Sequence, residues 1–485
     1  MLLKIDHKKL KERVYNQYNI KNINDFNLLK ISLKNKKEII RISYGNFFQL
    51  KSRFDYNNQK SNILNKSKIK KISNYLNNFR LLQNKFLNIY KSLKNKLFSI
   101  CYKNNLKSKK NINTIIISKH KLIDEINFIE LSKKIKKNHL ILFNNYKTKK
   151  KYSSLYNKSS INIIMKKNII SILKGYYFFL KNKEYIIKNY PLKNISKEEI
   201  KNFYIKFFTE LEFFKNNFKN INPKNIISSS FIGNEALVYY FRYYRKINTK
   251  FIAYSMHGVG GDSCNYLFNL ADILLVPGKI DKKIIDSCIY NKLNLLKIPK
   301  VKIVGSVRHY HWLNFLKKPP LKEKNKLSIL YICSNPIYFK KNIEQISINY
   351  LIKFAKKNKD INFIIKERPI FKTNFYNQNL KNLIVVDEKN FFIEDLINIS
   401  DICIGTSSSG ILRQAVHQNK NVLQMFHNDS YMLKLNQKVM IDSYSKFETS
   451  LKKIVSNKNN FRYKSEELLS KNINPVKKIT NILNN

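Results

Sequence analysis

The chain has 485 residues, of which 43% are hydrophobic and 13% are aromatic, and its 92 Lys and Arg against 32 Asp and Glu give a formal net charge of +60. The 30 Tyr and 32 Phe exceed what a disordered chain carries, so disorder is excluded as the main state. The length favours two or three domains over one small module.

The positive charge does not by itself indicate a nucleic-acid-binding protein. Only ten of the 92 basic residues are Arg, and Lys accompanies Asn and Ile along the whole chain. A surface that reads phosphates usually gathers its charge on one face and uses Arg for bidentate contacts. We therefore expect no specific nucleic-acid partner. Peripheral association with anionic membranes is compatible with the charge, since each well-placed Lys contributes about 1 kcal/mol.

Targeting and metal-binding signals are weak. The N-terminus is charged within four residues, and the longest apolar candidate for a membrane span, residues 169–180, is short and contains Lys174. The five cysteines are scattered and form no CxxC pair, which favours a reducing compartment and no metal site. We expect a cytoplasmic protein, at most peripheral to the inner face of the membrane.

The first half of the chain predicts a helical region followed by an α/β domain. Residues 1–110 place apolar side chains at helical spacing within Lys/Asn-rich sequence, and the domain is expected over 111–312. Its predicted strands are 113–119, 139–145, 226–227, 251–255, 273–276 and 301–304, and its predicted helices are 123–135, 197–218 and one that begins near 234. The 197–218 helix opens with a capping box, Ser196 and Glu199.

The pattern restarts after the Pro319-Pro320 pair, which indicates an interdomain connection. A second α/β domain is expected over 325–460, followed by a tail or return helix at 461–485. The predicted fold class is α/β, with two Rossmann-like, doubly wound parallel-sheet domains facing a cleft. Ligands bind such sheets beyond the carboxyl ends of the strands, so the loops after Ser255, Gly305, Ile365 and Ile404 are expected to converge there.

The loop between the predicted strand ending at 404 and the next helix is the most specific feature. Glycines and hydroxyl residues at this point let backbone amides approach an anion near a helix start. A single Ser or Thr would suffice as a helix cap, and this loop exceeds that need. The residues assigned to phosphate binding are Thr406, Ser407, Ser408, Ser409 and Gly410.

Two further strand ends carry cations. Lys366 and Arg368 stand in the sequence KERP, where the proline stops a predicted strand. Arg binds phosphate bidentately and is scarce in this chain, which gives Arg368 more weight than Lys366. Gly305 and Arg308 follow another strand and form a weaker candidate for the same edge.

The sequence MHGVGGD at 256–262 is the candidate for acid-base chemistry. His257 titrates near neutrality and can accept a proton from an acceptor hydroxyl, with Asp262 to assist it. The alternative is a turn with a packed histidine. The residues assigned to the acceptor side are Gly258, Gly260, Gly261 and, at a helix start, Glu235.

Residues 226–425 resemble bacterial GT-B glycosyltransferases, enzymes with two Rossmann-like domains that make capsular and other cell-envelope polysaccharides. The shared motifs, in chain order, are HG at 257–258, DILLVPG at 272–278, VGS at 304–306, KERP at 366–369, DLINISD at 395–401, the Ser-rich loop, and NKNVL at 419–423. KxHP followed by paired serines is similar to sialyltransferases, Kdo-transferring capsule enzymes and CDP-glycerol transferases, and Arg368 stands in place of that His.

The resemblance implies a nucleotide-activated sugar, or a glycerol-phosphate-like unit, as donor, held mainly by the second domain. It implies a glycan or lipid-linked acceptor, no cofactor, and an inverting transfer without a metal ion. Gln414 joins the donor side.

Two other functions stay open. The Ser-rich loop aligns with the TDSGGxxEE pattern of UDP-N-acetylglucosamine 2-epimerases, but Ser407 replaces the Asp, and Arg413 and Gln414 replace the acidic pair. The other alternative is a basic polyanion-binding protein with an inactive GT-B scaffold.

Overall fold

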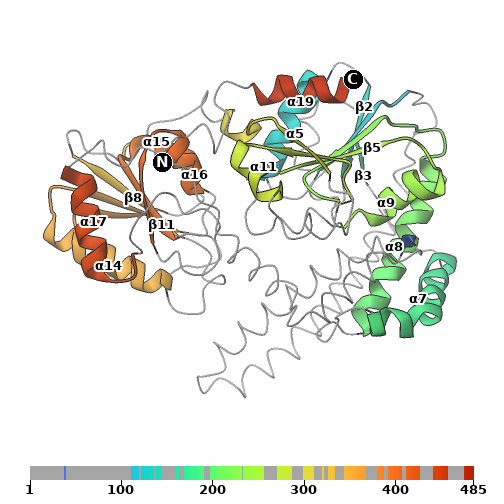
Figure 1. Cartoon of the computed structure of the whole chain (residues 1–485), viewed down its shortest axis with the longest axis horizontal. Coiled ribbons are helices and arrows are strands. Elements are labelled where there is room, and N and C mark those ends of the chain that lie inside the picture. The colour runs from blue at the N-terminus through green and yellow to red at the C-terminus, as the bar shows by residue number, and fades with distance from the viewer. Residues whose placement is uncertain are drawn as a thin grey trace.

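The computed structural model describes two α/β domains and a helical hairpin (Figure 1). The residues it describes are 38–39, 111–118, 122–135, 138–143, 160–162, 169–189, 197–231, 233–255, 270–286, 299–310, 319–321, 326–333, 343–367, 380–386, 391–406, 411–425, 441–456 and 474–484. Apart from Glu38 and Ile39, the predicted N-terminal helical region lies outside them.

The first domain contains a seven-stranded sheet in which all neighbouring strands are parallel, in the order β3-β2-β1-β4-β5-β6-β7. Its apolar runs, such as the fully buried Ile115, Ile116 and Ile117, are typical of parallel strands covered on both faces. The strands are β1 (Thr114–Ser118), β2 (His139–Phe143), β3 (Ser160–Asn162), β4 (Asn225–Ser228), β5 (Lys250–Tyr254), β6 (Ile273–Val276) and β7 (Lys300–Ile303).

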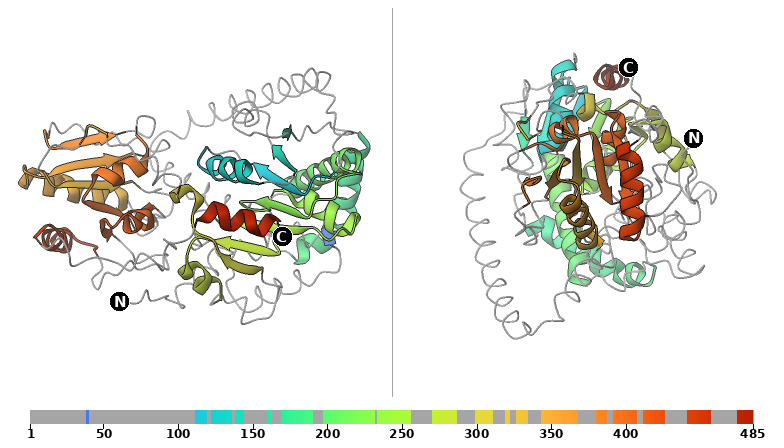
Figure 2. Two further views of the ribbon diagram at one scale, coloured as in Figure 1. Left: turned by 90° about the horizontal axis from the view of Figure 1, so that it is seen from above. Right: turned by 90° about the vertical axis from the view of Figure 1, so that its left-hand side faces the viewer.

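Helices cover both faces of this sheet (Figure 2). Ile115 and Ile117 share one buried cluster with α7 (Ile169–Asn189), α8 (Lys197–Asn217) and α9 (Glu235–Tyr239). Ile116 points to the opposite face and packs in a cluster with α5 (Leu122–Lys134) and α19 (Pro475–Asn484). The chain also forms η3 (Tyr240–Tyr244) after α9 and α11 (Lys279–Asp286) after β6.

The second domain repeats this architecture with five parallel strands in the order β10-β9-β8-β11-β12. Helices α14 (Ile343–Lys357) and α17 (Tyr444–Ser456) pack on one face, and α15 (Ile393–Ile399) and α16 (Ile411–His417) contribute to the cluster on the other. The strands are β8 (Ser328–Ile332), β9 (Asn362–Lys366), β10 (Leu383–Val386), β11 (Ile402–Thr406) and β12 (Asn421–Met425).

Both sheets are therefore doubly wound, and the predicted fold class is confirmed. The strand order reverses between β1 and β4 in the first domain and between β8 and β11 in the second. In open α/β sheets, such switch points open a crevice at the carboxyl ends of the strands.

The last helix returns to the first domain, although the second domain precedes it in the chain. Helix α19 lies beside α5 in Figure 1, and Ile479 and Leu483 are fully buried there. The Asn225 side-chain amide donates a 2.8 Å hydrogen bond to the Leu483 carbonyl. The first domain is thus completed by residues from both ends of the described chain.

Helices α7 and α8 form a closely packed hairpin. The predicted 197–218 helix is confirmed as α8, whereas α7 was not predicted. A Cβ built at Gly175 would lie 2.6 Å from the Ile205 Cα, so only glycine lets the two backbones approach this closely. The Phe178 ring packs 5.0 Å from the Tyr204 ring, centroid to centroid. Among the described helices, none combines the length and apolarity that a bilayer crossing requires.

Replacing Gly175 with Ala should weaken this hairpin. Alanine raises helix propensity by about 1 kcal/mol, but forcing its methyl group against backbone costs about 1–3 kcal/mol. We expect a lower free energy of unfolding in urea, with Glu184→Ala, an exposed position of the same helix, as the control. A stability gain in Gly175→Ala equal to the propensity difference would contradict the close approach.

Candidate active site

Two buried ion pairs join the first domain to the second. The Arg308 guanidinium, which follows β7, contacts the Glu394 carboxylate in the first turn of α15. Arg413 Nη1 of α16 lies 2.9 Å from Asp281 Oδ1 of α11. The second Asp281 oxygen accepts a 3.0 Å hydrogen bond from the Gly278 amide, so both carboxylate oxygens are satisfied.

These pairs bring the carboxyl edges of the two sheets together. Arg308 and Asp281 lie beyond the carboxyl ends of β7 and β6, and Arg413 lies beyond that of β11. Helix α15 leads back to the amino end of β11, so Glu394 in its first turn belongs to the carboxyl edge as well. In Figure 1, α11 and α16 accordingly occupy the facing sides of their domains.

Other side chains complete this junction. The imidazole rings of His309 and His417 meet edge to face, with centroids 3.8 Å apart. One buried apolar cluster includes Ile280 from the first domain and Leu412 from the second. The loops that were predicted to converge therefore start from edges that are held against each other.

Of the residues predicted to bind the donor, the structure describes Lys366, Thr406 and Gln414 in the second domain and Gly305 and Arg308 in the first. Lys366 is buried at the end of β9, where its Nζ donates a 2.9 Å hydrogen bond to the Phe391 carbonyl. Thr406 ends β11 opposite Met425. Arg368, Ser407, Ser408, Ser409 and Gly410 lie outside the described residues.

Gln414 is the most informative of these residues. It lies in α16, directly after the Ser-rich loop, and its side chain is buried. Its Oε1 accepts no hydrogen bond from any residue that the structure describes. A buried acceptor without a donor costs about 1–3 kcal/mol, so this oxygen is suited to receive a hydrogen bond from a ligand.

Tyr254 makes hydrogen bonds to both sides of the turn after β7. Gly305 adopts φ +84°, a conformation that favours glycine. The Tyr254 hydroxyl donates to the Gly305 carbonyl (3.2 Å) and accepts from the Val307 amide (2.8 Å), and burial raises the pKa of this phenol.

Arg308 follows this turn and forms the buried ion pair with Glu394. Its Nε is buried and has no hydrogen-bond partner among the described residues, so one donor of the guanidinium group is available to a ligand. Its contact with a donor phosphate stays a prediction.

Of the residues predicted for the acceptor side, the structure describes Glu235, in the first domain. Gly233 adopts φ +86°, and its amide donates a 2.8 Å hydrogen bond to Glu235 Oε1, which holds the loop after β4 in a tight turn. The side chain of Glu235 is buried beside the switch point between β1 and β4. His257, Gly258, Gly260, Gly261 and Asp262 lie outside the described residues.

A second carboxyl group, missed by sequence reasoning, lies near Glu235. Burial raises the pKa of Glu210 to about 7, Lys206 lowers it, and the neighbouring Glu235 raises it. Lys206 Nζ lies 3.6 Å from Glu210 Oε1. Nothing in the helical pattern of α8 distinguishes Glu210 from an exposed glutamate, because its burial depends on α9.

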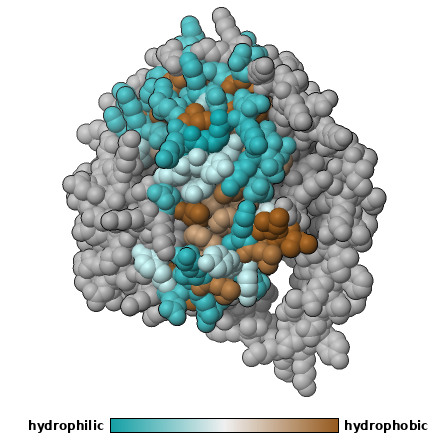
Figure 3. Space-filling view, turned by 90° about the vertical axis from the view of Figure 1, so that its right-hand side faces the viewer, coloured by the Kyte–Doolittle hydropathy of each residue, from teal (hydrophilic) through white to brown (hydrophobic). Residues whose placement is uncertain are grey.

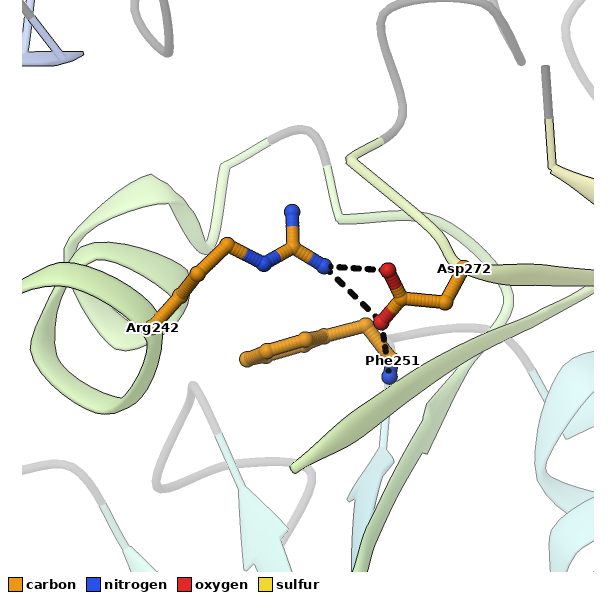
Figure 4. Close-up of polar contacts among 3 residues, drawn as sticks. All are labelled: Arg242, Phe251 and Asp272. Atoms are coloured by element: carbon orange, nitrogen blue, oxygen red, sulfur yellow. Dashed lines mark hydrogen bonds and ion pairs between the residues drawn. The ribbon is translucent and has the colours of Figure 1, made fainter. Parts of the chain in front are cut away.

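Two acids of the recognised motifs have structural roles instead. Both carboxylate oxygens of Asp272 lie 2.8 Å from Arg242 Nη2, and one of them accepts a 2.9 Å hydrogen bond from the Phe251 backbone amide (Figure 4). The Arg242 guanidinium lies over the Phe251 ring. Asp401 accepts a 2.8 Å hydrogen bond from the Ser328 backbone amide. Both acids precede their strands and so lie at the edge opposite the candidate site.

The pair between Arg308 and Glu394 should behave as a unit in a double-mutant cycle. Arg308→Met leaves a buried carboxylate without its partner and should destabilise the protein by about 3–5 kcal/mol, most of which the second change Glu394→Leu restores. Urea unfolding of both single variants and the double variant measures the coupling. The exposed pair Lys446–Asp442 is the control and should contribute below about 1 kcal/mol. Additive effects at 308 and 394 would contradict a shared buried pair.

The raised pKa of Glu210 predicts a fall in stability as the pH rises. The folded state holds this proton up to about pH 7, whereas the unfolded chain releases it near 4.5, the ordinary pKa of a glutamate. Stability is therefore lost between these two values, by about 3 kcal/mol. Glu210→Gln should remove this dependence between pH 5 and pH 8 in urea unfolding, and Glu212→Gln on the same helix should retain it. Equal slopes in both variants would refute the assignment.

No protein-family model matches the chain, and no curated protein matches it in sequence. Similar solved structures include UDP-N-acetylglucosamine 2-epimerase from Neisseria meningitidis bound to UDP-N-acetylglucosamine, with 13% identity, a TM-score of 0.48, and coverage of 77% of this chain and 100% of that one. A glycosyltransferase from Rickettsia africae has 14% identity, a TM-score of 0.46, and coverage of 77% and 98%. The wall teichoic acid polymerase TagF has 11% identity, a TM-score of 0.46, and coverage of 84% and 97%. The likeness concerns the fold, and it includes glycosyltransferases and epimerases alike.

Proposed function

We propose that this chain is a glycosyltransferase that moves a sugar, or a glycerol-phosphate-like unit, from a nucleotide-activated donor to a glycan or lipid-linked acceptor. The observation that carries the proposal is the meeting of two doubly wound sheets at their carboxyl edges, joined by Arg308–Glu394 and Arg413–Asp281. Ligands bind at such edges, and two facing edges provide separate places for two substrates.

The second domain is proposed to bind the donor. Its edge carries Lys366, the loop after Thr406 and Gln414, whose buried oxygen has no partner among the described residues and is proposed to accept a hydrogen bond from a sugar or ribose hydroxyl. Arg368 and the hydroxyls of Ser407, Ser408 and Ser409 are proposed to bind the phosphates. Cationic and hydroxyl groups would balance the charge of the departing nucleotide without a metal ion.

The first domain is proposed to bind the acceptor and to supply the base. His257 follows the end of β5 in the sequence, and β5 lies between β4, which leads to Glu235, and β6, which leads to Asp281. In the proposed step, the His257 imidazole takes the proton of the acceptor hydroxyl, with Asp262 to assist it. With a sugar donor, the acceptor oxygen bonds to the anomeric carbon while the bond from that carbon to the phosphate oxygen breaks, which inverts the configuration and releases the nucleotide. With a glycerol-phosphate-like unit, the acceptor oxygen bonds instead to the phosphorus of that unit while the bond from this phosphorus to the oxygen of the departing nucleotide breaks.

The environment of Arg413 supports transfer over epimerisation. Arg413 and Gln414 stand where the epimerase pattern has two acids, and Arg413 is bound to Asp281 across the domain junction. A guanidinium group committed to an ion pair cannot serve as a general acid or base near neutral pH. The proposed product is a capsular or other cell-envelope polysaccharide.

Gln414→Leu should separate donor binding from stability. The change removes a buried oxygen that has no hydrogen-bond partner in the described part of the chain, so the ligand-free protein should keep or gain thermal stability. The stabilisation by nucleotide should fall in the same variant, because a ligand that binds only the folded state raises its melting temperature. The measurement is a thermal-shift series with CMP, CDP, UDP and GDP and their common sugar conjugates.

His257→Ala serves as the matched variant in that series. It should retain the nucleotide-dependent shift but lose turnover of the donor with an acceptor glycan. If no nucleotide shifts the wild-type protein, the glycosyltransferase proposal fails, and the inactive polyanion-binding scaffold becomes the better explanation. Conversion of UDP-N-acetylglucosamine to its 2-epimer without an acceptor would instead establish an epimerase.

A further inference from the structure

Helix α7 carries an exposed apolar stripe with no equivalent among the described residues. Eight of the eleven large apolar or aromatic side chains that are exposed in the described part of the chain belong to it. Ile169 is 73% exposed and Tyr177 is 64% exposed. The eight residues are Ile169, Ile170, Leu173, Tyr176, Tyr177, Leu180, Tyr185 and Ile187.

The stripe is separate from the face with which α7 packs on its own domain. Ser171, Gly175, Phe179, Asn182 and Ile186 are buried and recur at three- or four-residue intervals, which puts them on one side of the helix. The exposed residues recur with the same period on the other side. Figure 3 shows apolar side chains gathered in the lower half of this end of the molecule, where Figure 1 places the hairpin of α7 and α8.

Lysines flank the stripe. At 100° per residue, Lys174 and Lys181 lie toward one margin and Lys183 lies along the other, whereas Glu184, the one acidic residue of the helix, lies within the stripe. Lys174 Nζ also lies 4.0 Å from Glu212 Oε2 of α8. Lys181 Nζ lies 5.9 Å from the centre of the Tyr177 ring. Long lysine side chains at the margin of an apolar face can keep their ammonium groups in the headgroup region while the apolar residues enter the acyl boundary.

We propose that this stripe of α7 docks on a bilayer surface that contains anionic lipids. Charge complementarity decides between a membrane and a second copy of this chain. Two copies that met through their stripes would set Lys174, Lys181 and Lys183 of one helix against the same three lysines of the other, with a single glutamate in each helix, whereas anionic headgroups neutralise the lysines. The lysines within and beside the apolar run favour a helix that lies in the interface over one that crosses it.

The position of α7 gives the docking a consequence that rests on the proposed function. Helix α8 packs against both α7 and α9, and α9 begins with Glu235 on the acceptor side. A membrane bound to α7 would lie beside the domain that we propose to bind the acceptor. A lipid-linked acceptor would then reach the site from the bilayer.

Vesicle co-sedimentation of the full chain tests the docking without any donor. Vesicles of phosphatidylcholine with 30% phosphatidylglycerol are compared with vesicles of pure phosphatidylcholine at about 150 mM salt. At this ionic strength, electrostatic interactions between exposed charges are screened beyond a distance of about 8 Å. Leu173→Gln/Leu180→Gln should lower the affinity for the anionic vesicles at least tenfold. Tyr244→Gln, an exposed aromatic residue outside α7, should leave it unchanged.

A second pair of variants isolates the lysines. Lys174→Gln/Lys181→Gln should weaken binding several-fold more than Lys356→Gln/Lys359→Gln, which removes two exposed charges from the second domain. Circular dichroism and the urea midpoint check folding, and the single change Tyr177→Gln repeats the test if the double leucine variant fails to fold.

Three results would overturn the docking proposal. They are no binding of the wild-type chain to anionic vesicles, equal binding by the leucine variant, and a change of molar mass in light scattering when the stripe is altered. The last result would identify a second copy as the occupant. The nucleotide-dependent thermal shift of the leucine variant should match that of the wild type, so a failure of the docking and a failure of the proposed transferase function are distinguishable.

Discussion

The geometry of the candidate site depends on two buried ion pairs that join the domains with opposite polarity. In one, an arginine of the first domain meets a glutamate of the second, and in the other, an aspartate of the first domain meets an arginine of the second. Removing charges from water is costly, and the cost is offset only when each charge meets its partner. The arrangement therefore penalises any other relative placement of the two edges, in which at least one buried charge would lose its counter-charge.

This constraint turns two similar sheets into one site with two different halves. Both sheets reverse their strand order beside the first strand, so each offers a crevice at its carboxyl edge. The edge of the second domain carries a buried lysine and an amide oxygen that is unpaired among the described residues, whereas the first domain carries two neighbouring carboxyl groups, Glu210 and Glu235. This contrast supports the proposed placement of an anionic donor on one side and a hydroxyl acceptor on the other.

The apolar stripe of α7 is not needed for the packing of the core. A globular helix needs one apolar face, and α7 already buries one against α8 through Gly175 and its neighbours. A second apolar face adds nothing to the fold and exposes large side chains to water. Its placement on the domain with the proposed acceptor side connects an interaction surface to the chemistry of the site.

The elements of both sheets could be predicted because their signals are local. A strand that is covered on both faces needs a continuous apolar run, and a helix needs apolar residues every three or four positions, so β1, α8 and β11 were predicted close to their observed bounds. Helix α7 was not predicted, because its apolar run at 169–180 is nearly continuous and shows no clear helical period. The glycine in that run weakens helix propensity, and packing against α8 outweighs this penalty.

The partners of the charged residues were decided only by the tertiary structure. Arg308 and Glu394, and likewise Asp281 and Arg413, are far apart in the chain, and nothing in the local pattern of either partner indicates the other. The burial of Glu210 and of the Gln414 oxygen also depends on neighbouring elements. Hydrophobic periodicity reports on a few consecutive residues, whereas ion pairing, desolvation and pKa depend on whatever the fold brings within a few ångströms.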